Sequence, residues 1–188
     1  MAKRYQLNII NFKSKKEITP FVEKMFVLME NTYGGLQTFV PIPKKQIQLY
    51  QKKYFRYIHP DFIKCVTDKN DELIAFCITM PSFTEALKKA KGKLFPFGFL
   101  YIIKALYFNS KASFYLIGTH PKYQNKGVTA IIFNEMQKTF NRHGCDIVET
   151  NPELEENSSI QNLWKNYEHR KHKRRLTVSK KIEKEAML

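Results

Sequence analysis

Apolar and polar positions follow several different periods along the first half of the chain, and each period predicts an element. Residues 5–12 alternate as a strand does, whereas residues 21–32 repeat apolar side chains at helical spacing. A second helical pattern covers residues 43–58, with its basic side chains mostly opposite the apolar ones. Two β-rich runs then flank the turn formers of residues 68–71, which predicts an antiparallel hairpin.

The second half of the chain continues this mixture of strands and helices. The pattern predicts a strand over residues 112–119, a helix over residues 126–143 and a buried strand over residues 145–150. Asn157 precedes a further helical pattern, and the basic residues 174–182 predict a last strand. Together the elements predict a mixed sheet with helices on both faces.

One segment does not fit an ordinary amphipathic pattern. Residues 94–108, LFPFGFLYIIKALYF, are nearly all apolar or aromatic, but the run is too short to span a bilayer and Pro96, Gly98 and Lys104 interrupt it. We expect a helical insertion over about residues 82–109. Packing of its helix against the sheet is the favoured interpretation, and contact with an acyl chain or a membrane interface is the alternative.

Composition and charge narrow the class of protein. With 188 residues, 43% of them apolar and 14% aromatic, the chain fits a single globular domain over residues 1–188. Its net charge of +15 predicts attraction to anions, whether nucleic acid, acidic lipid or a polyphosphorylated small molecule. Three cysteines without C-x-x-C spacing predict neither a disulfide framework nor a zinc cluster. We expect a cytoplasmic protein without a signal peptide or a transmembrane segment.

The segment YLIGTHPKYQNKGVTAIIFNEMQ, residues 115–137, places a polar turn between a strand and a helix. The start of a helix leaves backbone N–H groups without partners and carries partial positive charge, so it can hold an anion. Gln124, Asn125 and Lys126 add donors and a cation, and Gly127 permits close backbone approach. The spacing matches neither a P-loop nor a dinucleotide fingerprint. These residues therefore predict either a phosphate site or an ordinary capped turn.

The same segment resembles the acyl-CoA binding motif of the GCN5-related N-acetyltransferases (GNATs), Q/R-x-x-G-x-G/A. Pro121, Gln124 and Gly127 occupy motif positions, and Thr129 stands where the second glycine is usual. The predicted order of elements also resembles that of the family. The resemblance is clearest over residues 81–180 and extends to a mostly bacterial subgroup of unassigned substrate, in which this domain is often the C-terminal half of a longer chain.

This resemblance implies a fold and an activity. The fold is the α/β (α+β) GNAT fold, a central mixed, mostly antiparallel sheet flanked by helices, with the acyl-CoA motif at about residues 112–143. The activity is direct transfer of an acetyl or other acyl group from acetyl-CoA or another acyl-CoA to an amine, without a metal. The candidate acceptor is a small molecule or a peptide, and the candidate partners are an N-terminal domain or a second copy of the chain in a homodimer.

Two other classes of function stay open. Two features suggest a catalytically silent acyl-CoA-binding domain. Trp164 falls where the family usually has a tyrosine that acts as the general acid, and residues 94–108 are apolar. A nucleic-acid or ribosome-associated module is suggested by the net charge and by HRKHKRR at residues 169–175. The basic residues are scattered over several elements, so nucleic acid is the less favoured partner.

The resemblance also implies positions for the cofactor. Backbone amides of residues 124–130 would hold the CoA pyrophosphate, and the strand edge at residues 116–119 would pair with pantetheine. An amide near Ile117 or Gly118 would polarise the thioester carbonyl. Asn157 would contact pantetheine or simply cap its helix. The implied cofactor residues are therefore Ile117, Gly118, Thr119, Gln124, Asn125, Lys126, Gly127, Val128, Thr129, Ala130 and Asn157.

Two side chains are candidates for proton transfer. Glu149 ends the strand that lies beside the phosphate-binding strand in the family, so it is the candidate base, with an ion pair to a Lys or Arg as its alternative role. The indole of Trp164 cannot usefully give up a proton. Tyr167 lies one turn later on the same helix face, and it is therefore the candidate acid.

Overall fold

The structure is a computed structural model, and it divides into two compact units, Met1–Glu149 and Thr150–Leu188. Among the described residues, the first unit contains most of the secondary structure, and the second contains one helix. The prediction of a single domain over residues 1–188 stays a prediction. The residues that the structure describes are 6–35, 39–53, 58–155, 157–176 and 178.

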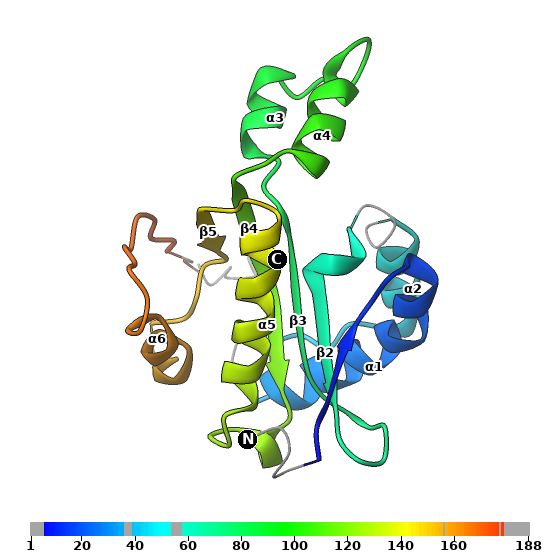
Figure 1. The fold of residues 1–188 in the computed structure, drawn as a ribbon, viewed down its shortest axis with the longest axis vertical. Coiled ribbons are helices and arrows are strands. Elements are labelled where there is room, and N and C mark those ends of the chain that lie inside the picture. Colours follow the sequence, from blue (N-terminus) through cyan, green and yellow to red (C-terminus); the bar gives the residue numbers. More distant parts are fainter. Residues whose placement is uncertain (1–5, 36–38, 54–57, 156, 177, 179–188) are drawn as a thin grey trace, which may run out of the picture. The chain divides into compact units, whose positions relative to one another are not determined.

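A five-stranded sheet in the order β1-β2-β3-β4-β5 forms the centre of the fold (Figure 1). The first four strands pair antiparallel. The fifth begins beside the start of β4, because the amides of Asp146 and Ile147 both donate to the carbonyl of Ser110. The sheet is thus mixed and mostly antiparallel, which confirms the predicted fold class and the hairpin around residues 68–71. The strands are β1 (Asn8–Asn11), β2 (Ile63–Thr67), β3 (Leu73–Pro81), β4 (Lys111–Thr119) and β5 (Ile147–Thr150).

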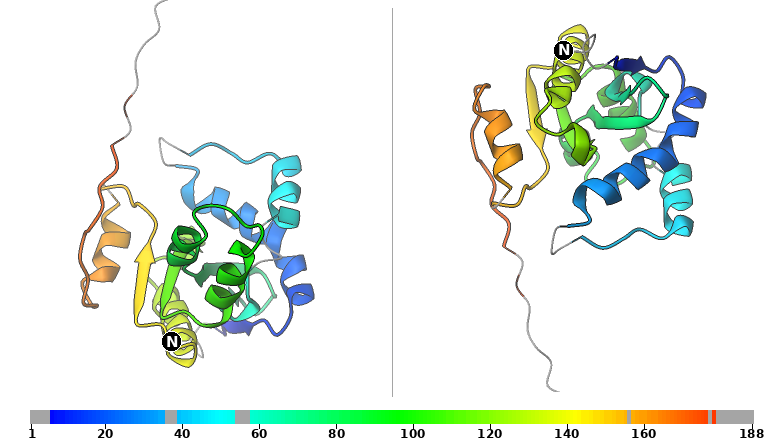
Figure 2. Two further views of the ribbon diagram at one scale, coloured as in Figure 1. Left: turned by 90° about the horizontal axis from the view of Figure 1, so that it is seen from above. Right: turned by 90° about the horizontal axis from the view of Figure 1, so that it is seen from below.

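Helices cover both faces of the sheet (Figure 2). Helix α1 (Lys15–Tyr33) packs on β3 and β4, whereas α5 (Val128–Arg142) packs on β2 and β3 from the other side. Because both faces are covered, every residue of β2 is buried, and so is nearly all of β3. The predicted helices are confirmed at these two places. Helix α2 (Lys44–Lys53) confirms the start of the helix predicted over residues 43–58, and residues 54–57 lie outside the described part.

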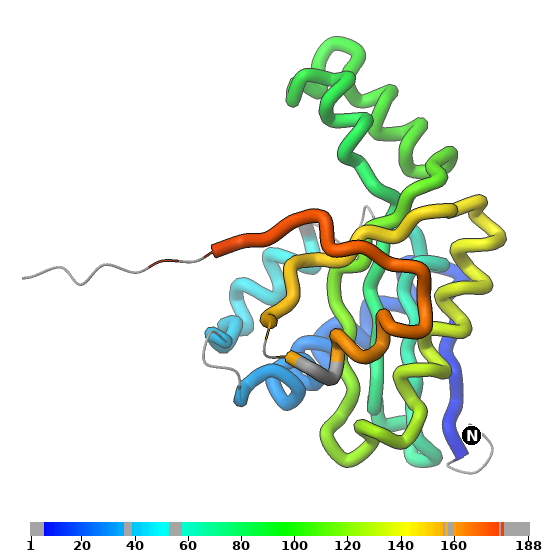
Figure 3. The backbone as a smooth tube through the Cα atoms, turned by 90° about the vertical axis from the view of Figure 1, so that its left-hand side faces the viewer, coloured from blue at the N-terminus to red at the C-terminus, as the bar shows by residue number. Residues whose placement is uncertain are grey.

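The insertion between β3 and β4 is a helical hairpin that extends beyond the ends of these strands (Figures 1 and 3). It consists of α3 (Thr84–Lys89) and α4 (Gly98–Tyr107), which pack against each other. A helix is therefore present where one was expected, but its large apolar side chains are exposed rather than buried on the sheet. In the described part of the chain, no helix combines the length and apolar character that crossing a bilayer requires.

All three cysteines are free. Cys65 on β2 and Cys77 on β3 are fully buried, and Cys145 is partly exposed. Burial raises the pKa of the Cys65 and Cys77 thiols well above the ordinary value for cysteine. These two thiols therefore behave as core side chains.

The second unit is built around the short helix α6 (Ser158–Trp164). The side chain of Asn157 caps this helix, since its carbonyl oxygen accepts the amide of Ile160 at 3.4 Å. The indole N–H of Trp164 donates to both carboxylate oxygens of Glu153, at 2.9 and 3.1 Å. The predicted last strand is absent from residues 174–176 and 178, and the rest of its range lies outside the described residues.

The contact between Gly118 and Phe76 predicts a position that tolerates no side chain. A Cβ atom at Gly118 would lie 2.6 Å from the Phe76 ring, whereas a Cβ at Gly35 would meet nothing within 4 Å. We expect Gly118→Ala to lower the free energy of unfolding by about 1–3 kcal/mol, measured by urea denaturation, because the buried ring must move. The control Gly35→Ala should change it by less than about 0.5 kcal/mol. Equal effects of the two substitutions would contradict this account of the β3–β4 contact.

Candidate acyl-CoA site

The turn between β4 and α5 leaves a helix start without a cap. Asn125 and Gly127 adopt left-handed backbone angles, with φ of 59° and 74°. Gly127 is the residue that tolerates this conformation at little cost, and it directly precedes Val128, the first residue of α5. Among the described residues no side chain caps α5, and its first turn contains no acidic residue. The first amides and the partial positive charge of α5 are therefore available to an anion.

Side chains of the turn are tied to the end of β4. The amide group of Gln124 donates to the carbonyl of Thr119 at 3.2 Å, and the hydroxyls of Thr119 and Thr129 lie 3.2 Å apart. The ammonium of Lys126 lies 5.6 Å from the centre of the Tyr123 ring. The structure therefore brings together the predicted residues of β4 and of the turn. Thr129, which replaces the second glycine of the motif, points its hydroxyl at β4.

The edge of β4 that faces away from β3 carries accepting carbonyl groups. The hydroxyl of Tyr33 donates to the carbonyl of Ile117, and the hydroxyl of Thr32 lies 3.4 Å from the carbonyl of Thr119. Opposite the shift in β3 between Ile78 and Thr79, the register of β4 skips Tyr115, as in a β-bulge. A bulge redirects the strand, and this one lies directly before residues 116–119, the regularly paired segment along which the resemblance expects pantetheine to pair.

Tyr33 is a residue of this site that the sequence did not single out. It is the last residue of α1, and it lies 84 positions before Ile117, to which it donates. The helical pattern predicted only that a helix ends nearby. No local motif marks such a long-range contact.

Three solved acetyltransferase structures are similar to this chain in fold. An aminoglycoside acetyltransferase from an uncultured soil metagenomic sample matches with a TM-score of 0.56 and 9% identity over 97% of this chain and 100% of the other. The ribosomal-protein-S18-alanine N-acetyltransferase from Escherichia coli matches with a TM-score of 0.52 and 12% identity over 85% and 75% of the two chains. The PaiA N-acetyltransferase from Thermoplasma acidophilum, in complex with coenzyme A, matches with 0.51 and 13% over 85% and 87%. This chain has the GNAT fold.

One relative is similar in sequence over most of this chain. Protein YghO of Escherichia coli (strain K12) is 25% identical over 171 residues, and the match covers 86% of this chain and 44% of YghO. The chain therefore spans less than half of the length of that relative. No protein-family model matches the chain.

The remaining predicted site residues belong to other parts of the GNAT fold. Glu149 is half-buried in β5. Asn157 and Tyr167 lie in the second unit, where Asn157 caps α6 and the Tyr167 ring lies 6.4 Å from the ring of Trp164. The capping role of Asn157 is thus observed. The cofactor contact of Asn157 and the catalytic roles of Glu149 and Tyr167 stay predictions.

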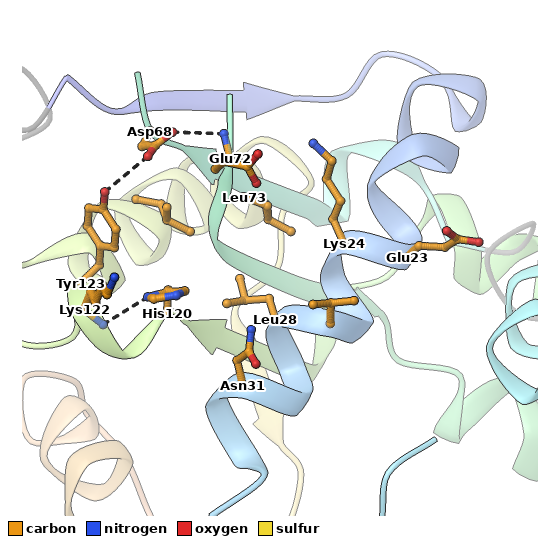
Figure 4. A pocket seen from close by; sticks show the side chains of 12 residues that line it. Glu23, Lys24, Leu28, Asn31, Asp68, Glu72, Leu73, His120, Lys122 and Tyr123 are labelled. Carbon is orange, nitrogen blue, oxygen red and sulfur yellow. Dashed lines mark hydrogen bonds between the residues drawn. The ribbon is translucent and has the colours of Figure 1, made fainter. Parts of the chain in front are cut away.

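A pocket of about 560 Å³ lies beside the turn, between α1 and the β2–β3 connection (Figure 4). Glu23, Asp68 and Glu72 give it carboxylates, in a chain that is otherwise strongly basic. The Tyr123 hydroxyl lies 3.5 Å from a carboxylate oxygen of Asp68. Slight burial and the negative charge of Asp68 raise the pKa of Tyr123. Val27, Leu28, Leu73 and Ile74 give the pocket an apolar part as well, so its lining is mixed.

Away from the turn, His59, Asp61 and His143 offer three ligand atoms that all lie within 4.8 Å of one another. Such a set could hold a divalent metal. Here the groups bond one another, because His143 Nε2 lies 3.0 Å from Asp61 Oδ2 and His59 Nδ1 accepts the Asp61 amide at 3.3 Å. The three residues thereby link the segment before β2 to the end of α5. The prediction that the protein needs no metal stays a prediction.

The Asp61–His143 pair predicts a pH-dependent part of the stability. Burial alone would raise the pKa of Asp61, but the hydrogen bond from His143 and the positive charge of Arg142 outweigh it, so the pKa lies below its ordinary value of 3.8. A carboxyl with a lowered folded-state pKa contributes stability above its unfolded pKa and loses it as the pH falls through the folded one.

Asp61→Asn should therefore flatten the dependence of the unfolding free energy on pH between about pH 5 and pH 2, measured by urea denaturation at each pH. The exposed Asp71, in the β2–β3 connection, provides the control Asp71→Asn, which should keep the steeper wild-type slope. An unchanged slope in Asp61→Asn would show that the pair makes no such contribution.

Proposed function

We propose that this protein is an N-acyltransferase that transfers an acetyl or other acyl group from acyl-CoA to an amine. The observation that carries the proposal is the uncapped start of α5 directly after β4, with Gly127 left-handed and no acidic side chain in the first turn. A diphosphate needs this combination of unpaired amides, positive potential and close backbone approach. Among solved proteins of the same fold, PaiA is in complex with coenzyme A, and the aminoglycoside acetyltransferase AAC(6')-Iy is in complex with a CoA bisubstrate analogue.

In this proposal the cofactor lies along β4 and ends at the turn. The amides of residues 124–130 hold the pyrophosphate, with Lys126 adding a positive charge. Pantetheine pairs with the edge of β4 at residues 116–119, where the carbonyls of Ile117 and Thr119 already accept hydrogen bonds from side chains. The amide of Ile117 or Gly118 polarises the thioester carbonyl.

The chemistry requires two proton transfers. The neutral amine nitrogen attacks the thioester carbon, and it gives up one proton to a base as the new carbon–nitrogen bond forms; Glu149 is the candidate base. The carbon–sulfur bond breaks, and the departing thiolate takes a proton from an acid. Tyr167 is the candidate from the sequence, and Tyr33 is a second candidate because its hydroxyl donates to the β4 edge.

The acceptor is proposed only as a class. Proteins of this fold include enzymes named for aminoglycosides and for a ribosomal protein, so both small molecules and peptides are candidate amines. A partner domain or a second copy that completes the acceptor pocket belongs to the same proposal. A silent acyl-CoA-binding domain is the alternative that a lack of turnover would favour.

A carboxylate at Gly127 should abolish CoA binding, because it would face the pyrophosphate. The test is Gly127→Glu, titrated with acetyl-CoA and longer acyl-CoAs by calorimetry and by thermal shift. Gly144 offers a matched control, since it is also left-handed, with φ of 65°, and follows the other end of α5. Gly144→Glu should bind CoA as the wild type does. Unchanged affinity in Gly127→Glu would overturn the site, and stabilisation of the wild type by duplex DNA alone would favour the nucleic-acid alternative.

Tyr33→Phe should separate the two candidate acids. If Tyr33 protonates the thiolate, the substitution should lower kcat by about 100-fold while KM for acetyl-CoA changes little, measured as thiol release with a panel of amines. The control Tyr101→Phe, at an exposed tyrosine of α4, should retain kcat. A loss in Tyr167→Phe and none in Tyr33→Phe would assign the acid to Tyr167 instead.

A further inference from the structure

Helix α4 is packed with its small residues inward and its large residues outward. Gly98 and Ala105 are the buried residues of the helix. A Cβ atom at Gly98 would lie 3.1 Å from the Cβ of Ala90, so the hairpin closes tightly at this point. The exposed face instead carries a run of large apolar side chains at helical spacing, which are Phe99, Leu100, Ile103 and Tyr107, between 40% and 60% exposed.

The turn before α4 extends this surface. Leu94, Phe95 and Phe97 are exposed, Phe95 at 83%, and the Phe95 and Phe99 rings lie 6.3 Å apart. The amide of Phe99 donates to the carbonyl of Leu94 at 2.9 Å, which holds the turn against the helix start. We call these side chains the hairpin surface, and its members are Leu94, Phe95, Phe97, Phe99, Leu100, Ile103 and Tyr107. A contiguous exposed apolar surface of this kind marks an interaction site.

The charge around the hairpin surface has one sign. Residues 82–109 contain five lysines and a single acidic residue, Glu85, so their net charge is 5 − 1 = +4. Glu85 is paired with Lys88 at 3.3 Å, and the side chains of the lysines are exposed. The five are Lys88, Lys89, Lys91, Lys93 and Lys104.

This combination of apolar and basic side chains favours an anionic bilayer over a second copy of the chain as the partner. A second copy of the chain would bring two sets of lysines together, and like charges oppose such contact. An anionic bilayer offers both an apolar boundary for the aromatic side chains and negative headgroups for the lysines. The hairpin extends beyond the strands that carry it (Figure 3), so its turn can approach a flat surface before the sheet does.

We propose that the hairpin surface binds the interface of a membrane rich in anionic phospholipid. The ten residues of α4 lie within the headgroup boundary and do not cross it, with Phe95 and Phe97 inserted and Lys91 and Lys93 among the headgroups. Binding at this surface is independent of acyl transfer and of CoA. The membrane-binding proposal can therefore be wrong while the proposed function is right, and the reverse.

The test is sedimentation of the full chain with vesicles of phosphatidylcholine, with and without phosphatidylglycerol. We expect binding at least about tenfold tighter when phosphatidylglycerol is present, with a loss in high salt, because the lysines add electrostatic attraction. The double variant Phe95→Ser/Phe97→Ser and the variant Lys91→Glu/Lys93→Glu should each lose about tenfold or more of this affinity.

Matched controls lie outside the hairpin. Leu49→Ser removes an apolar side chain of 58% exposure from α2, and Lys16→Glu/Lys69→Glu reverses two exposed lysines elsewhere. Both should bind vesicles as the wild type does, apart from a small general effect of the lower net charge. The thermal midpoint of every variant reports whether it is folded.

Three results would overturn the proposal. They are no binding to anionic vesicles, equal loss in the control and hairpin variants, and vesicle binding that Phe95→Ser/Phe97→Ser leaves unchanged. Sedimentation velocity without lipid tests whether the chain forms a dimer instead. A dimer that the Phe95→Ser/Phe97→Ser variant loses would assign the hairpin surface to a second copy of the chain.

Discussion

The ring of Phe76 lies so close to Gly118 that β4 has no room for a side chain at that position. The two residues are partners in the β3–β4 ladder, whose backbone hydrogen bonds fix the spacing of the strands, and the hydrogen bond from the His120 amide to the Ile74 carbonyl continues the pairing into the turn. The direction in which the chain leaves β4 follows from these two contacts. The start of α5, and with it the proposed phosphate site, therefore depends on how β3 holds β4.

The opposite edge of β4 is occupied in a different way. Side chains from α1 and from the turn donate to the carbonyls of Ile117 and Thr119, so this edge is hydrogen-bonded without a continuous strand beside it. Side-chain partners can be exchanged for a ligand at less cost than a strand, because only a few rotamers must change. An edge of this kind suits a strand that has to receive an extended cofactor arm.

The features that the sequence predicted well are those determined by neighbours in the chain. The left-handed turn needs Gly127, the cap of α6 needs Asn157, and the β2–β3 hairpin needs its polar turn, so each leaves a local trace. The face that α4 exposes was not predicted, because a nearly uniform apolar run does not show which side of the helix is buried. Only the packing of Gly98 against Ala90 and the Lys93 backbone, directly after α3, reveals it. The contact of Tyr33 with β4 is likewise invisible to a local pattern, since it joins elements 84 residues apart.

The reactivity of the two core cysteines reports on the opening of the sheet. Cys65 and Cys77 lie on the neighbouring strands β2 and β3, fully buried and with thiol pKa values raised by that burial. A thiol reacts as its thiolate and only when a reagent reaches it. Alkylation of both groups must therefore wait until the central hairpin opens, while the partly exposed Cys145 reacts without that delay. The lag between the two modifications measures how often the middle of the sheet comes apart in the native protein.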